Sequence, residues 1–175
     1  MEMFGAMPPS LRRRAIGGVY LLYFLVAFLG AGLKSHAVVV VSDAVYVVLT
    51  LLFFLLLRHV NAGVAILATA FSLAGQALDV IFDQAAAGLV ADGLFLLLLG
   101  SLWWRSRLIP RALAGVVTVA GVGWLTFAIP GLPTYVQIPV EVVGAVAELA
   151  LMLWLLIRGV DVTPNRPTIA EAVPV

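Results

Sequence analysis

The sequence predicts an all-α protein: a polytopic membrane protein whose six transmembrane helices form a compact bundle. Of its 175 residues, 63% are hydrophobic and 11% are charged, whereas a soluble domain carries roughly 25% charged residues. The apolar residues fall into six runs of about 20 residues, which is the length a helix needs to cross the hydrocarbon core of a bilayer. Because lipid offers no partners to backbone polar groups, runs of this length favour helices over strands.

Composition excludes several kinds of functional site. The chain has no cysteine, which excludes disulfides, iron–sulfur clusters, thiolate zinc sites and cysteine nucleophiles. Its two histidines, His36 and His59, are expected on opposite sides of the membrane, which disfavours a histidine-rich metal site or a bis-histidine haem. The sequence also lacks a glycine-rich phosphate loop, an HExxH motif and a GxSxG motif. We therefore predict no cofactor, no metal and no catalytic residues.

The first two helices are predicted over residues 15–33 and 37–57, after a short cytoplasmic lead over residues 1–14. A basic segment before an apolar run can mark a signal peptide. Here the run is longer than the usual apolar region of about 7 to 15 residues, which indicates an uncleaved first helix. The second run is rich in β-branched residues, but its length in lipid favours a helix.

Four more helices follow, separated by short turns. A basic turn lies over residues 105–111, a proline-rich loop over 130–139, and a tail with three prolines over 159–175 is predicted to be cytoplasmic and disordered. The transmembrane domain thus covers residues 15–158, with its last four helices predicted at 62–82, 87–104, 112–129 and 140–157.

The distribution of cationic residues predicts the orientation. Six spans place both termini on one side, and nine arginines fall on that side, whereas Lys34 is the cation on the other. By the positive-inside rule both termini are cytoplasmic. The arginines are Arg12, Arg13, Arg14, Arg58, Arg105, Arg107, Arg111, Arg158 and Arg166.

Polar residues interrupt the end of the third apolar run. Ser72, Gln76, Asp79 and Asp83 are spaced at offsets of 4, 7 and 11 residues, so a continuous helix would carry all four on one face. Carboxylates are costly to bury in lipid. This face is therefore predicted to form one wall of a polar site.

Other helices bring carboxylates to a similar depth. At 1.5 Å per residue, Asp43, Asp92, Glu141 and Asp79 lie about 20 to 25 Å from the cytoplasmic ends of their helices, just inside the outer boundary of the hydrocarbon core. Glu148 lies about 15 Å from Arg158, near the midplane. We predict an outward-facing, ligand-binding cavity formed by Glu148, Gln76, Asp79, Asp43, Asp92 and Glu141.

Each carboxylate also has a structural interpretation. Asp83 and Glu141 could mark solvated helix ends, and Asp43 and Asp92 could cap helices or pair with Lys34. Glu148 is harder to explain in this way, because a midplane carboxylate costs several kcal/mol unless it is protonated, paired or hydrated. Its structural alternative is a hydrogen bond to Gln76, Tyr20 or Tyr23.

Tryptophans and glycines have simpler interpretations. Trp103, Trp104, Trp154 and Tyr135 stand near helix ends and are predicted to anchor the protein at the lipid interface. Small residues inside the apolar runs are predicted to allow close helix packing rather than ligand binding. These are Gly75, Gly121, Gly123 and Gly144.

The second half of the chain resembles a known family. The segment RSRLIPRALAGVVTVAGV, a short proline loop and then VEVVGAVAELALMLWLLIRGV are similar to the C-terminal half of the bacterial multi-pass membrane family called domain of unknown function 4386. RRRAIGGVYLLYFLVAFLGAGL and LRHVNAGVAILATAF are similar to its first and third spans, so the resemblance covers most of residues 11–160. It implies a six-helix integral membrane protein of a bacterial plasma membrane, with no agreed activity. The matching positions are Arg107, Pro110, Arg111, Glu148, Trp154 and Gly159.

Three functions remain open at this stage. The first is a protein that binds or transports a small molecule, a cation or a proton through the carboxylate-lined cavity. The second is a non-catalytic accessory subunit of a larger membrane complex, and the third is a membrane-embedded enzyme that uses paired carboxylates on a lipid. A homo-oligomer is a further possible assembly. We favour the first and expect the bilayer, rather than nucleic acid, as the partner surface, because no basic stripe is present.

Overall fold

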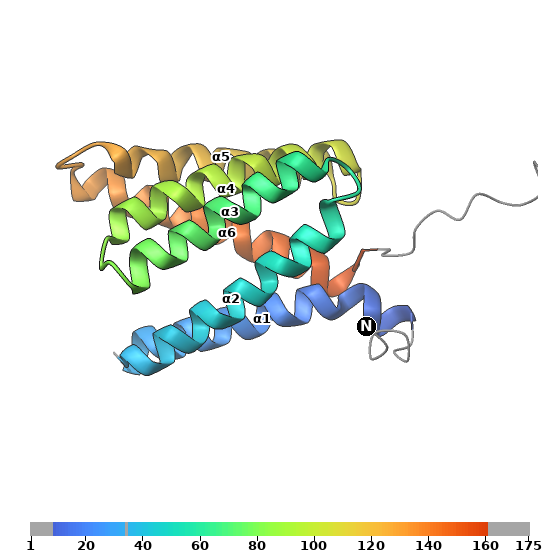
Figure 1. Ribbon diagram of the computed structural model, residues 1–175, viewed down its shortest axis with the longest axis horizontal. Helices are drawn as coiled ribbons and strands as arrows, with labels where there is room; N and C mark the ends of the chain where they lie inside the picture. The colour runs from blue at the N-terminus through green and yellow to red at the C-terminus, as the bar shows by residue number, and fades with distance from the viewer. Residues whose placement is uncertain (1–8, 34, 161–175) are drawn as a thin grey trace, which may run out of the picture.

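The computed structural model describes residues 9–33 and 35–160 and shows an all-α fold (Figure 1). Five of its helices are long and apolar enough to cross a membrane, and the apolar part of the first, Arg14–Gly30, is shorter. The predicted helical class and the predicted number of helices are therefore confirmed. The elements are α1 (Pro9–Leu33), α2 (His36–Leu57), α3 (Ala62–Val80), α4 (Ala85–Ser106), α5 (Arg111–Leu125), the short 3-10 helix η2 (Thr126–Ala128) and α6 (Thr134–Ile157).

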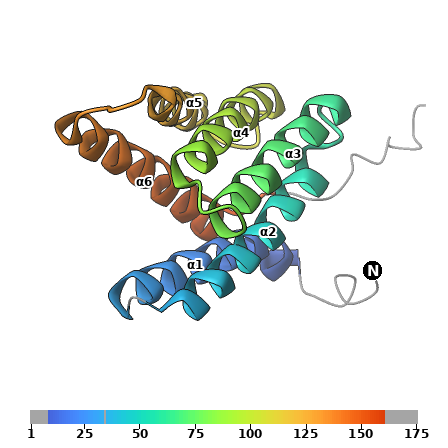
Figure 2. The same ribbon diagram turned by 60° about the vertical axis from the view of Figure 1, so that its left-hand side comes forward.

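The six helices form a ring of three antiparallel hairpins. Each helix packs against its neighbours in the chain, and α1 packs against α6, which closes the ring (Figure 2). The start of α1 and the end of α6 lie at the same end of the bundle as the α2–α3 and α4–α5 turns (Figure 1). This arrangement brings the first and last helices side by side.

The two ends of the bundle differ in charge. We call one the basic end, because the arginines of α1, of the α2–α3 and α4–α5 turns and of the C-terminus of α6 lie there. We call the other the acidic end, and it carries Asp79 and Asp83 at the end of α3 and Glu141 early in α6. The assignment of the basic end to the cytoplasm stays a prediction from the positive-inside rule.

Several helix boundaries differ from the predicted ones. α1 begins at Pro9, inside the predicted lead, and α6 begins at Thr134, inside the predicted proline loop. Pro139 lies inside α6, where it cannot donate the helical backbone hydrogen bond to the carbonyl oxygen of Tyr135. α3 ends at Val80, two residues early. Most of the predicted lead and tail, residues 1–8 and 161–175, lies outside the described residues.

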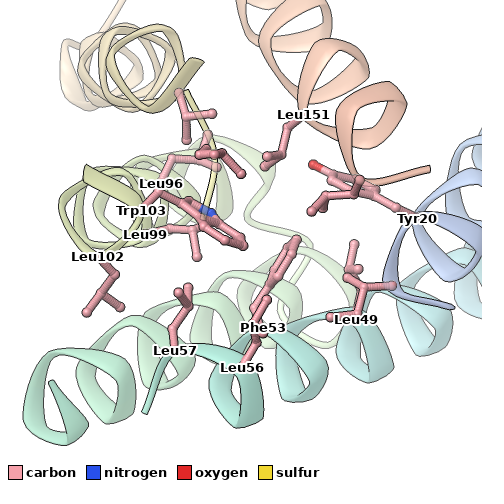
Figure 3. Packing of buried hydrophobic residues seen from close by; sticks show 14 of the residues in the cluster. Tyr20, Leu49, Phe53, Leu56, Leu57, Leu96, Leu99, Leu102, Trp103 and Leu151 are labelled. Carbon is pink, nitrogen blue, oxygen red and sulfur yellow. The ribbon is translucent and has the colours of Figure 1, made fainter. Parts of the chain in front are cut away.

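The core is concentrated near the basic end. Trp103 is fully buried there, and its ring packs edge-on against Phe53 at a centroid distance of 5.8 Å (Figure 3). The prediction of an interfacial role for Trp103 is wrong, since the residue faces the ring interior. The neighbouring Trp104 is 50% exposed and Tyr135 is 79% exposed, as an interfacial position requires.

Glycines let the helices approach closely. A Cβ atom on Gly17 of α1 would collide with the backbone of Leu155 and Leu156 in α6. A Cβ on Gly121 of α5 would lie 2.8 Å from the carbonyl oxygen of Gly93 in α4. The predicted packing role is confirmed for Gly121, and it holds in the same way for Gly75 against α4 and for Gly144 against α5.

Candidate functional site

An open pocket lies between α1, α4, α5 and α6, toward the acidic end. Its volume is about 340 Å³, which falls in the range of small-molecule sites. It is lined by Tyr23, Phe24, Leu89, Trp124, Glu141, Ala145 and Glu148.

The pocket exists because α1 and α6 diverge. The two helices cross closely at Gly17, near the basic end, where no side chain separates their backbones. They separate toward the acidic end (Figure 2). Side chains of α1 and α5 then fill only part of the space between the helices, and the remainder is the pocket.

Glu148 sits at the deep side of this pocket. It is partly buried, and its Oε2 atom accepts a hydrogen bond of 2.9 Å from the Tyr20 hydroxyl group of α1. Tyr20 is itself 2% exposed and stacks on Phe24 at a centroid distance of 5.4 Å. The hydrogen bond therefore fixes the carboxylate and ties α6 to α1 where the pocket begins. Of the three partners considered from the sequence, Tyr20 is the one that bonds to Glu148.

Glu141 shares the pocket with Glu148. The two lie seven residues apart in α6, so they stand two turns apart on one helical face. Glu141 is exposed, as expected near a solvated helix end, and it also lines the pocket. The pocket is thus acidic both at its mouth and at its deep side.

Trp124 supplies an aromatic wall. A Cβ atom on Gly144 would lie 2.8 Å from the Cε2 atom of the indole, so the ring lies directly on the backbone of α6. The ring also packs on Phe127 at a centroid distance of 5.7 Å. Because Gly144 lacks a side chain, the indole can reach the pocket between α5 and α6.

Asp92 and Asp43 lie outside this pocket. Asp92 of α4 faces α3, where a Cβ atom on Gly75 would be 2.7 Å from its Oδ1 atom. That oxygen is buried and has no hydrogen-bond partner in the part of the chain that the structure describes, and the same holds for Oδ2 of Asp43. Asp92 is within electrostatic range of Glu148, Asp79 and Asp43. The two aspartates therefore belong to a second acidic group beside the pocket.

The polar face predicted for the third helix is only partly formed. Ser72 is fully buried and shares a hydrogen bond of 2.8 Å with Thr50 of α2. Gln76 is partly buried, whereas Asp79 is exposed. Asp83 lies beyond the end of α3, in a left-handed conformation with φ of 52°. The prediction that one helical face carries all four residues is wrong, because the helix ends before Asp83.

The predicted site residues thus divide into two groups. Glu148 and Glu141 line the pocket, whereas Asp92, Asp79 and Asp43 do not. Asp92 is nevertheless within electrostatic range of Glu148 as well as of the other two aspartates. Among the described residues, Gln76 forms no hydrogen bond with Glu148, whose partner is Tyr20. No group of three or more His, Asp or Glu side chains is arranged to hold a metal ion within residues 9–33 and 35–160. The role of all six residues in ligand binding stays a prediction.

Sequence reasoning missed the aromatic part of the site. The sequence indicates Tyr23 only as a hydrogen-bond partner of Glu148, and it predicts no role in the site for Phe24 or Trp124. Trp124 follows Gly121 and Gly123 near the acidic end of α5. A large ring among small residues is a signal that could have indicated a side chain lying between two helices.

A comparison with known protein families finds a match over the second half of the chain. Residues 77–159 match the family model described as Domain of unknown function (DUF4386). Neither a curated protein nor a solved structure matches the chain. The matched segment runs from the end of α3 through α6 and includes Trp124, Glu141 and Glu148. Residues 77–159 of this chain are therefore a DUF4386 domain, which confirms over this segment the family that the sequence resembles.

Proposed function

We propose that this protein binds or transports a small ligand across or at the membrane, with the pocket between α1, α4, α5 and α6 as its binding site. The observation that carries the proposal is the position of Glu148. A carboxylate of an apolar helix faces an open pocket and is held by the Tyr20 hydroxyl group. Ionisable groups within membrane spans usually face a cavity and mark a substrate or ion path.

The size and openness of the pocket support binding rather than a purely structural role. A structural hydrogen bond between Tyr20 and Glu148 would need no adjoining space, yet about 340 Å³ lies beside it. A cavity of that size with two carboxylates in its lining has room for water or a ligand. With the basic end in the cytoplasm, the pocket opens toward the outer face of the membrane.

The absence of cysteine from the sequence gives a direct test. Ala145→Cys places one thiol in the pocket, and Val146→Cys places one on the next residue of α6, which is 57% exposed on the outside of the bundle. A maleimide reacts with the thiolate, which forms in contact with water and not in lipid. We expect a membrane-impermeant maleimide, added outside intact cells, to label Ala145→Cys at least about tenfold faster than Val146→Cys.

Two other outcomes would contradict parts of this proposal. Equally slow labelling of both variants would show that the pocket holds no water, and would contradict the proposed binding function. Fast labelling of Ala145→Cys only in inside-out vesicles would keep the pocket but reverse the orientation.

A further inference from the structure

We propose that the ligand is a small organic cation in which one positive charge is surrounded by apolar groups, as in a quaternary ammonium ion. This inference rests on the proposed function and names the class of ligand for the same pocket. It follows from which side chains line the pocket and from the chemistry that they share.

The charge of the lining favours a cation. Two of the seven lining residues are glutamates, and none of the seven is lysine, arginine or histidine. An anion would meet two like charges, whereas a cation would neutralise one of them. The excess of acidic over basic residues in the lining therefore predicts a positively charged ligand.

The aromatic side chains favour an organic cation over a hydrated metal ion. Tyr23 and Phe24 of α1 and Trp124 of α5 contribute three rings to a pocket with seven lining residues. Aromatic faces attract cations, and cages of such rings bind quaternary ammonium groups. Calcium or magnesium would instead need about six or more oxygen ligands, which two glutamates and an otherwise mostly apolar lining do not provide.

The Tyr20 hydrogen bond prepares Glu148 for this role. Because Tyr20 is buried and donates to Oε2, the carboxylate keeps one position without a ligand. A counter-ion that is already in place loses less conformational freedom on binding. A quaternary ammonium ion, which has no hydrogen-bond donor, can lie beside this carboxylate without displacing Tyr20.

Choline and its neutral isostere 3,3-dimethylbutan-1-ol form a suitable pair of probes, because they share shape and differ in charge. We expect choline to slow maleimide labelling of Ala145→Cys in the full-length protein, and the isostere to leave the rate unchanged. In the otherwise natural protein, isothermal titration in detergent should detect choline binding. Glu148→Gln and Trp124→Leu should each weaken that binding by about tenfold or more.

Matched controls accompany both variants. Asp83→Asn removes an exposed carboxylate that does not line the pocket, and Trp104→Leu removes an exposed indole near the basic end. Both should bind choline as the natural protein does. If Glu148→Gln does not fold, Glu141→Gln changes an exposed residue of the same pocket and should still weaken choline binding by about threefold.

The outcomes separate this inference from the proposed function. Rapid labelling of Ala145→Cys would support the proposed pocket. If choline and the isostere then protect the thiol equally, or if neither protects it, the proposal that the ligand is an organic cation is wrong. Unchanged choline binding in Glu148→Gln and Glu141→Gln would also contradict the proposal that the ligand is an organic cation. Failure of Ala145→Cys to react at all would instead overturn the proposed function.

Discussion

The two halves of the bundle are built differently. In the half next to the basic end, large apolar side chains from five helices fill the ring, and α1 touches α6 at Gly17. In the half next to the acidic end, the same two helices stand apart around a pocket that two glutamates line. The most deeply buried side chains all lie on the basic side or near the middle of their helices. They include Trp103, Leu49, Leu56, Leu57, Leu96, Leu99, Leu102, Leu151, Leu155 and Val117.

Close packing and open polar space are therefore separated along the length of the bundle. Association of helices in lipid depends on close packing, because lipid is as apolar as the side chains. The basic half meets that need. The acidic half keeps polar groups and open space, which cost stability and would serve binding under the proposed function.

The largest expected effect comes from closing the contact at Gly17. Gly17→Val adds a side chain where even a Cβ atom would collide with the backbone of α6, so α1 must move outward. We expect a loss of about 3 kcal/mol of unfolding free energy, at the upper end for overpacking. The measurement is reversible unfolding of the purified protein in mixed micelles.

The adjacent Gly18 provides the control for that variant. A Cβ atom on Gly18 would meet nothing within 4 Å, so Gly18→Val should stay within about 0.5 kcal/mol of the natural protein. Equal losses for the two variants would mean that the α1–α6 crossing is not the tight part of the bundle, and the comparison of the halves would fail.

The helices were predictable because length and apolarity are local properties. All six appear in the structure, and Glu148 stood out because a carboxylate deep in a span has few explanations. The inward side of each helix was harder to predict. Lipid-facing and buried residues are both apolar, so sequence did not distinguish buried Trp103 from exposed Trp104.

Which residues line the pocket depends on contacts between segments that are far apart in the chain. Tyr20 and Glu148 are 128 residues apart in the chain, and they meet because α1 closes the ring against α6. Trp124 reaches the pocket only because Gly144 of another helix offers no side chain. Nothing within a single helix predicts either contact, which is why the sequence could not show that Glu148 and Glu141 line the pocket whereas Asp92, Asp79 and Asp43 do not.

A second prediction compares two leucines of α6. Leu151 is fully buried in the basic half, and Leu153 is 49% exposed to the outside (Figure 3 shows Leu151). Leu151→Ala leaves a cavity and should cost about 2 kcal/mol, at the low end for core positions because the unfolded side chain is also in an apolar medium. Leu153→Ala should cost much less in the same unfolding measurement. Similar costs would show that the basic half is not tightly packed.

The last prediction is a gain in unfolding free energy rather than a loss, and it is the smallest of the three. Asp92 lies in the acidic half, and its buried Oδ1 atom has no hydrogen-bond partner in the described part of the chain. A charge in this position lowers stability, because its lost hydration is not replaced. Asp92→Asn should therefore raise the unfolding free energy by about 1 kcal/mol. Asp83→Asn is the control, since Asp83 is exposed and asparagine also accepts its left-handed backbone. A loss of stability in Asp92→Asn alone would show that this carboxylate supports the fold, and the acidic half would then contribute to stability in its own right.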